Sequence, residues 1–187
     1  MTQPFETAPE PMPFVPIQGF FGQICQSFDA GTKIATAMGD VPVGELWQGD
    51  HVLTYDGGTV PVLWTGQGAL HGRDMATPVL FTPGAIGNYA PLRLAPEQLV
   101  LFASAQAELL FGSHEVLVPA RAMVNGRDIC FALGKEQHYV QLLLAHHALV
   151  FAEGASCASF LPDGPHSTQQ AVRPVLSYAE ALALMGG

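Results

Sequence analysis

The chain has 187 residues, of which 49% are hydrophobic and 12% are charged. An average globular protein has about 25% charged residues, so this composition favours one well-packed domain with tails, or two small ones, and argues against global disorder. Seven Lys and Arg against sixteen Asp and Glu give a net charge of −9, which leaves no basic surface for phosphates and argues against nucleic-acid binding.

Residues 1–24 form a Pro/Phe-rich leader. Five prolines exclude a helix and favour extended geometry. The interleaved phenylalanines indicate either a disordered leader or an arm that lies on an apolar surface. The leader lacks the basic start of a signal peptide, and nowhere does the chain offer eighteen uninterrupted apolar residues. We therefore expect no signal peptide and no membrane span, and either a cytoplasmic location or export without a leader.

Residues 25–164 are predicted to form one antiparallel all-β domain with almost no helix. Short β-prone runs recur at residues 52–54, 60–64, 78–81, 100–102, 115–118 and 139–144. Turn signals separate them: Gly39-Asp40, Gly49-Asp50, Asp56-Gly57-Gly58, Asn88 and Asn125-Gly126. Asp-Gly and Asn-Gly supply the positive φ angles that hairpin turns require. Many short strands at this spacing are typical of an antiparallel domain. The remaining residues, 165–187, form a tail with a short Ala/Leu-rich helix over 178–185.

The cysteines and histidines do not form a recognisable metal site. Cys25, Cys130 and Cys157 form no CxxC pair, and their odd number argues against a disulfide framework. A single bridge between Cys130 and Cys157 stays open, beside the commoner state of buried thiols. His146 and His147 are adjacent, and neighbouring strand residues point to opposite faces, so both cannot face one metal ion. We expect neither a metal nor another cofactor.

Four stretches resemble, in order, the bacterial Hint domains of the hedgehog/intein type. They are residues 27–54, 78–88, 94–101, and 108–120 together with 139–154. The first contains Ser27-Phe28, then Gly31-Thr32, then a strand that follows Gly49-Asp50. Each stretch alone is a weak signal, but their order and spacing are specific. The resemblance implies a Hint fold with pseudo-twofold β-hairpins, here followed by the short C-terminal helix.

The resemblance also implies self-processing chemistry. In such domains a Cys, Ser or Thr side chain attacks the carbonyl of the preceding residue and turns the amide into a thioester or ester. A histidine protonates the leaving nitrogen, and polar donors hold the oxyanion. The implied substrate is the chain's own N-terminal segment, and no other protein partner can be named.

Three residues occupy the implied catalytic positions. Ser27 takes the nucleophile position, Gln98 stands where the family has a histidine, and His147 matches the family's second histidine. A serine hydroxyl ionises far less readily than a thiol, and Gln98 can donate a hydrogen bond but cannot deliver a proton. Each also has a structural interpretation: Ser27 as a turn serine, Gln98 as a hydrogen-bonding core residue, His147 as a satisfied core histidine.

Further positions depart from the family pattern. Ala95, Gln141 and Ala145 stand where relatives usually have Thr, His and Asp. Cys25 could serve as the nucleophile only with a two-residue insertion, and otherwise is a packed thiol. Because general-acid assistance contributes about 10²–10⁴-fold in rate, its loss favours a Hint-type domain with weakened or lost catalysis.

Three alternatives remain open. The domain is an active autoprocessing unit that cleaves the bond between Gln26 and Ser27, or it keeps the fold only as a non-catalytic binding or structural module. A conventional serine hydrolase ranks last, because the chain has no Gly-x-Ser-x-Gly elbow.

Overall fold

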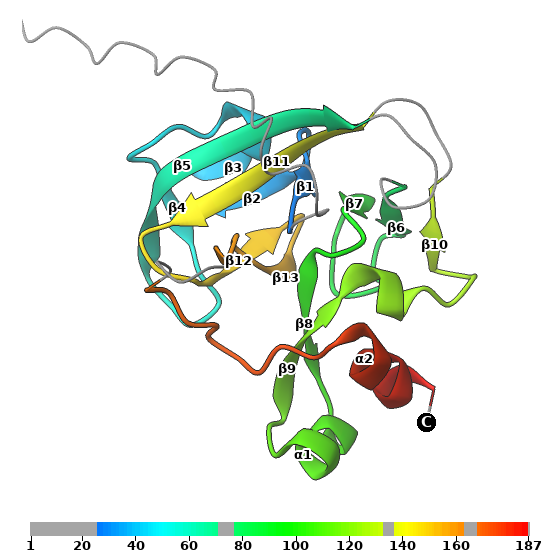
Figure 1. Ribbon diagram of the computed structural model, residues 1–187. Coiled ribbons are helices and arrows are strands. Elements are labelled where there is room, and N and C mark those ends of the chain that lie inside the picture. Colours follow the sequence, from blue (N-terminus) through cyan, green and yellow to red (C-terminus); the bar gives the residue numbers. More distant parts are fainter. Residues whose placement is uncertain (1–25, 71–76, 133–136, 163–167, 187) are drawn as a thin grey trace, which may run out of the picture.

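The computed structural model describes residues 26–70, 77–132, 137–162 and 168–186 (Figure 1). The strands are β1 (Phe28–Asp29), β2 (Lys33–Thr36), β3 (Gly39–Pro42), β4 (His51–Leu53), β5 (Thr59–Leu70), β6 (Val79–Phe81), β7 (Leu92–Leu94), β8 (Leu99–Ala103), β9 (Glu115–Pro119), β10 (Ile129–Phe131), β11 (Gln137–Leu144), β12 (Leu149–Ala152) and β13 (Ala155–Ala158). The helices are α1 (Ala105–Phe111) and α2 (Tyr178–Met185), with the 3-10 turns η1 (Val43–Glu45) and η2 (Ala120–Met123).

All named strands except β3 form one winding antiparallel path, from β10 at one end to β9 at the other, and β3 pairs with β2 beside this path. The longest pair is β5 with β11, and β1 lies between β11 and β7. Phe28 of β1 pairs with Val140 on one side and Leu94 on the other. The first residues of the domain are therefore held between two strands that lie far away in the sequence.

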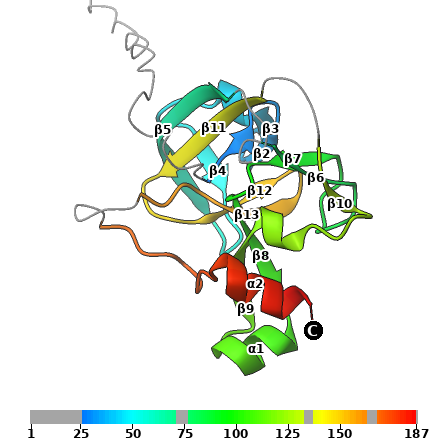
Figure 2. The ribbon, with the colours of Figure 1, turned by 45° about the vertical axis from the view of Figure 1, so that its right-hand side comes forward.

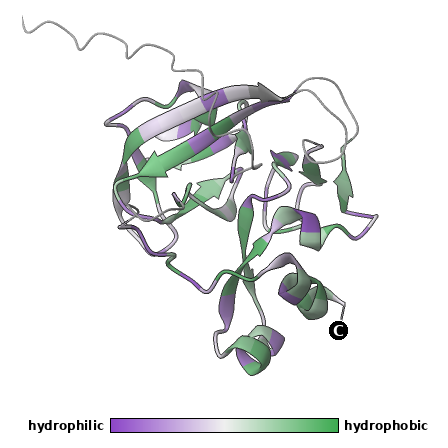
Figure 3. Ribbon diagram, viewed as in Figure 1, coloured by the Kyte–Doolittle hydropathy of each residue, from purple (hydrophilic) through white to green (hydrophobic). Residues whose placement is uncertain are grey.

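Apolar side chains from these strands fill one main core. In β11 burial alternates, so that Val140, Leu142 and Leu144 face inwards and Gln141 and Leu143 are half-buried. This alternation follows from the two-residue period of a strand. A smaller cluster joins Leu99, Leu117, Leu149 and Ala158. Hydrophobic residues lie along β8, β9 and the β12–β13 hairpin (Figure 3).

The predicted all-β class is confirmed, and each of the six predicted runs overlaps a strand: β4, β5, β6, β8, β9 and β11. The predicted C-terminal helix is also confirmed as α2, Tyr178–Met185. Ser177 begins it with a capping box, because its side chain accepts from the backbone N–H of Glu180 while the Glu180 carboxylate accepts from the N–H of Ser177.

Helix α1 was not predicted, because the sequence indicated almost no helix in this domain. Ser104 caps its first turn by accepting from the N–H of Ala107, and Gly112 ends it with a φ of 70°. These are ordinary start and stop residues, but seven residues are too few for a helical hydrophobic period to be recognised.

The C-terminal residues return across the domain. Figure 2 shows α2 beside β9, and α2 packs against η2 and β9. Leading into α2, Val175 forms a parallel bridge with Leu117 of β9. Of the helices that the structure describes, none is long and apolar enough to cross a membrane.

The thiols of Cys130 and Cys157 are both free, so the bridge left open by the sequence is not formed. Cys130 is half-buried, whereas Cys157 is fully buried in the core. The predicted leader of residues 1–24, and Cys25, lie outside the described residues.

Candidate functional site

The open end of the β12–β13 hairpin organises the candidate site. Leu149 pairs with Ala158 at the end of the hairpin ladder. One residue further out, the N–H of Ser159 donates to the carbonyl of Ala148 over 2.8 Å, and the N–H of Ala148 donates to Oγ of Ser159 over 3.1 Å. His147 immediately precedes Ala148 in the chain, so the hairpin fixes the position of its backbone.

Ser27 and its preceding residue are anchored on both sides of their shared peptide bond. The N–H of Leu161, just beyond β13, donates to Oε1 of Gln26 over 3.1 Å. The N–H of Ala95 donates to the carbonyl of Ser27 over 3.0 Å, and only 6% of Ser27 is exposed. This peptide bond is therefore held in place beside the segment that leaves the hairpin.

Gln98 is fully buried, and its side chain donates hydrogen bonds to the backbone. Its Nε2 donates to the carbonyl of Ala158 over 2.8 Å and to the carbonyl of Leu99 over 3.1 Å. A carboxamide has two N–H donors, so both are engaged. No hydrogen-bond partner of Oε1 is found among the described residues.

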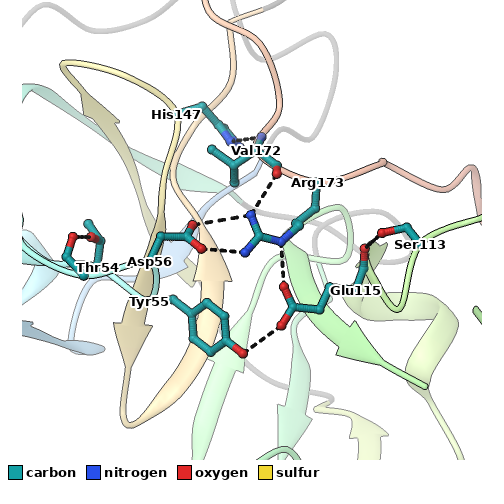
Figure 4. A network of polar contacts seen from close by, with 9 residues as sticks. Thr54, Tyr55, Asp56, Ser113, Glu115, His147, Val172 and Arg173 are labelled. Carbon is teal, nitrogen blue, oxygen red and sulfur yellow. Dashed lines mark hydrogen bonds and ion pairs between the residues drawn. The ribbon is translucent and has the colours of Figure 1, made fainter. Parts of the chain in front are cut away.

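His147 is 1% exposed, and its ring is tied to the C-terminal segment (Figure 4). The backbone N–H of Val172 donates to Nδ1 over 3.2 Å. Because Nδ1 accepts this bond, the proton of the neutral ring is on Nε2. Burial lowers the pKa of His147 to about 4, and the neighbouring His146 acts in the same direction.

These bonds connect the three predicted site residues around the hairpin end. Ala95 donates to the Ser27 carbonyl through its N–H and accepts the N–H of Gln98 over 2.9 Å, so Ser27 and Gln98 share one neighbour. Gln98 and His147 in turn border the paired residues Ala158 and Leu149. Ser27 and Gln98 are therefore linked through Ala95, and Gln98 and His147 both lie at the end of the β12–β13 hairpin.

The other positions that departed from the family pattern have simpler surroundings. Ala95 is fully buried, and Gln141 is half-buried in β11 opposite Gly66. Ala145 is exposed after β11, where its N–H donates to the carbonyl of Pro61 over 3.1 Å.

His146 is exposed whereas His147 is buried, so the two rings have different surroundings. The two lie in the turn between β11 and β12, however, so strand alternation is not the reason. Nowhere in the described ranges do three or more metal-ligating side chains cluster.

Two partners of the site were missed by the sequence analysis. Ser159 and Val172 contact it through bonds to Ala148 and His147, and neither residue belongs to a recognisable motif. A single hydroxyl or backbone N–H that meets its partner only through tertiary folding leaves no local sequence pattern.

The chain matches one protein family, described as "Hint domain", over residues 26–164. Among solved structures it is similar to a bacterial intein-like domain from Clostridium thermocellum, with 15% identity, a TM-score of 0.49, and coverage of 72% of this chain and 98% of that one. For the MchDnaB-1 intein the identity is 14%, the TM-score 0.47 and the coverage 71% and 98%. For a splice-inactive variant of the AceL NrdHF class 3 split intein these values are 14%, 0.49, 72% and 97%. No curated protein matches the chain significantly.

Proposed function

Because the chain belongs to the Hint domain family, with the match spanning residues 26–164, we propose that it is a self-processing-type domain whose acyl-shift chemistry is weakened or lost. The proposed reaction centre is the peptide bond between Gln26 and Ser27. The intramolecular substrate is the N-terminal segment that precedes this bond.

The proposed reaction has two steps. Oγ of Ser27 attacks the carbonyl carbon of Gln26, the C–N bond breaks, and the hydroxyl proton ends on the Ser27 nitrogen, which leaves an ester and a free amine. Water then hydrolyses the ester, which restores the Ser27 hydroxyl and gives Gln26 a carboxylate. The first step is slow unless an acid protonates the departing nitrogen.

The engagement of Gln98 is the observation that carries the proposal. Both of its N–H groups donate to backbone carbonyls, of Leu99 and Ala158, so neither is free for the nitrogen of Ser27. The remaining atom of the amide, Oε1, is an acceptor. In this position Gln98 supports the hairpin and supplies no proton.

His147 does not replace the missing acid. With a pKa of about 4, fewer than about one ring in a hundred is an imidazolium at neutral pH. In the proposed role its Nε2–H is a hydrogen-bond donor to the developing oxyanion, which orients and stabilises but does not transfer the needed proton. The nearby Glu97 is engaged as well, because Oε1 lies 2.6 Å from Nε of Arg121.

The first test is the intact mass of the expressed chain, with and without hydroxylamine, which cleaves esters much faster than amides. We expect the chain to stay whole and to release little or no fragment of residues 1–26. Rapid release of that fragment would instead support an active autoprocessing domain, and release of residues 1–24 would assign the nucleophile to Cys25.

The second test restores the missing groups in the triple variant Ser27→Cys, Ala95→Thr, Gln98→His. An unperturbed cysteine thiol has a pKa of about 8.5 and an unperturbed imidazole one of about 6.5, so the variant gains an ionisable nucleophile and a proton donor. With excess thiol, we expect cleavage before residue 27 to be faster than in the wild type. The matched control carries Ser27→Ala with the same two other changes and should stay whole. A folded triple variant that is equally inert would contradict Ser27 as the nucleophile position and favour a non-catalytic module.

A further inference from the structure

The C-terminal strap, residues 169–176, lies beyond the part of the chain that matches the family and contacts His147 through Val172. Nε2 of Gln169 donates to the carbonyl of Leu144 over 2.9 Å at one end. At the other end, Leu117 of β9 donates to the carbonyl of Pro174 over 2.8 Å and accepts the N–H of Leu176 over 2.9 Å. Between these anchors, Val172 makes its bond to the imidazole.

Arg173 ties the centre of the strap to two other segments of the domain (Figure 4). Its Nε donates to Oε2 of Glu115 over 2.6 Å, and its terminal nitrogens contact both carboxylate oxygens of Asp56 over 2.5 and 3.5 Å. One terminal nitrogen also donates to the carbonyl of Val172 over 2.9 Å. The guanidinium thus holds the residue whose N–H meets His147.

The charges of Arg173, Asp56 and Glu115 stabilise one another. Hydrogen bonds to Asp56 and Glu115 raise the pKa of Arg173, and the bond from Arg173 lowers the pKa of Glu115. The hydroxyl of Tyr55 adds a hydrogen bond of 2.8 Å to the other oxygen of Glu115. The side chains of Arg173 and Glu115 are 22% and 24% exposed, so water only partly screens the pair.

The contact with Val172 decides the tautomer of His147. A backbone N–H can donate only to a ring nitrogen that lacks a proton. If Nδ1 carried the proton, two N–H groups would face each other and the Val172 donor would lose its acceptor. The strap therefore selects the neutral ring with its proton on Nε2. The ring that it contacts belongs to a buried residue.

We propose that Arg173 is a positioning residue: by holding Val172 against His147, it fixes the imidazole as the Nε2–H tautomer and keeps it from water. This rests on the proposed function only in placing His147 at the processing centre. The tautomer and its control by Arg173 are properties of the folded chain whether or not any bond is cleaved.

The test uses the full chain labelled with ¹⁵N and a long-range ¹H–¹⁵N spectrum of the histidine rings. We expect wild-type His147 to show a single tautomer with a protonated Nε2. In Arg173→Ala the Nδ1 and Nε2 shifts should move towards a mixture of tautomers. Arg173→Lys, which keeps the charge but loses the planar fork, should give an intermediate spectrum. Arg93→Ala, at an exposed position of β7, is the control and should leave the spectrum unchanged.

A second measurement follows acylation of each histidine by diethyl pyrocarbonate with peptide mass mapping. In Arg173→Ala, His147 should react roughly tenfold faster, the factor that corresponds to about 1.4 kcal/mol less opening free energy. The exposed His138 should react equally in all variants and serves as the internal standard.

If Arg173→Ala does not fold, Asp56→Asn replaces it, because this residue lies on a turn with 47% of its side chain exposed. That variant should shift His147 in the same direction. Folded Arg173 or Asp56 variants with an unchanged tautomer and an unchanged acylation rate would overturn the proposal. Neither measurement depends on cleavage, so the outcome is independent of whether the acyl shift occurs.

Discussion

Nε2 of Gln98 donates a hydrogen bond of 2.8 Å to the carbonyl of Ala158, sixty residues further along the chain. The same nitrogen donates to the carbonyl of Leu99, so one buried side chain supports strand β8 and strand β13 at their junction with the candidate site. Gln98, which we propose to occupy the position of the family's histidine, is thus a structural bridge between these strands.

Removal of this bridge should destabilise the domain. Gln98→Met keeps the volume of the side chain but removes both of its hydrogen bonds to buried backbone carbonyls, and we expect the free energy of unfolding to fall by about 1–3 kcal/mol. Gln67→Met is the control, since the exposed Gln67 donates to the carbonyl of Gly44 over 2.9 Å and its loss should cost less than about 0.5 kcal/mol. Urea unfolding measures both, and equal losses would contradict the bridging role.

Acid should weaken the domain through His147. Its pKa is about 4 when folded, against about 6.5 for an unfolded histidine, so between these values the unfolded state binds a proton that the folded state does not. Stability is therefore retained above about pH 6.5 and falls as the pH decreases, by about 2 kcal/mol between pH 8 and pH 5. The ion-paired Glu115 has a lowered pKa, so its contribution is lost only at still lower pH.

This pH dependence is measured by urea unfolding at each pH. His147→Gln should remove most of the slope between pH 8 and pH 5, whereas His138→Gln, at an exposed position, should keep it. An unchanged slope in His147→Gln would show that another group is responsible.

The turn between β12 and β13 should tolerate no side chain at Gly154. Its φ is 90°, and an added Cβ would lie 2.9 Å from Cδ1 of Tyr89. Gly57 has a φ of 95° with nothing within 4 Å, so Gly57→Ala carries only the backbone strain. We expect Gly154→Ala to lower the melting temperature more than Gly57→Ala does. Tyr89→Ala should recover part of the excess loss, and strictly additive effects of the two changes would exclude the steric explanation.

The free thiols should differ in reactivity. Burial raises the pKa of Cys157 to about 12, and its side chain is fully enclosed, whereas Cys130 is half-buried. In the folded chain, iodoacetamide should modify Cys130 and spare Cys157; urea should expose both. Peptide mapping separates the two sites, and rapid modification of Cys157 without denaturant would indicate local opening of β13.

Much of the fold follows from local patterns, and most of the site's contacts do not. Short β-prone runs and turn residues predict β11 and the hairpin turns because both signals act within a few residues. Likewise the helix after Ser177 is predictable, but the packing of α2 on η2 and β9 is not. The order of motifs assigns Ser27, Gln98 and His147 to one site. It gives no sign that Gln98 donates to Ala158 or that Val172 fixes the imidazole, because these contacts arise only from tertiary packing.

The bonds between Leu117 and the strap also affect how copies of the chain meet. Strand β9 ends the winding path of strands, and such a strand presents unpaired N–H and C=O groups on which a strand of another molecule can assemble. Here the N–H and C=O of Leu117 are taken by Pro174 and Leu176 of the same chain. Proline has no N–H of its own, so the covering segment is a poor template for a further strand at that point. The crossing of the tail over β9 thus protects this edge of the sheet against intermolecular β-pairing and the aggregation that follows from it.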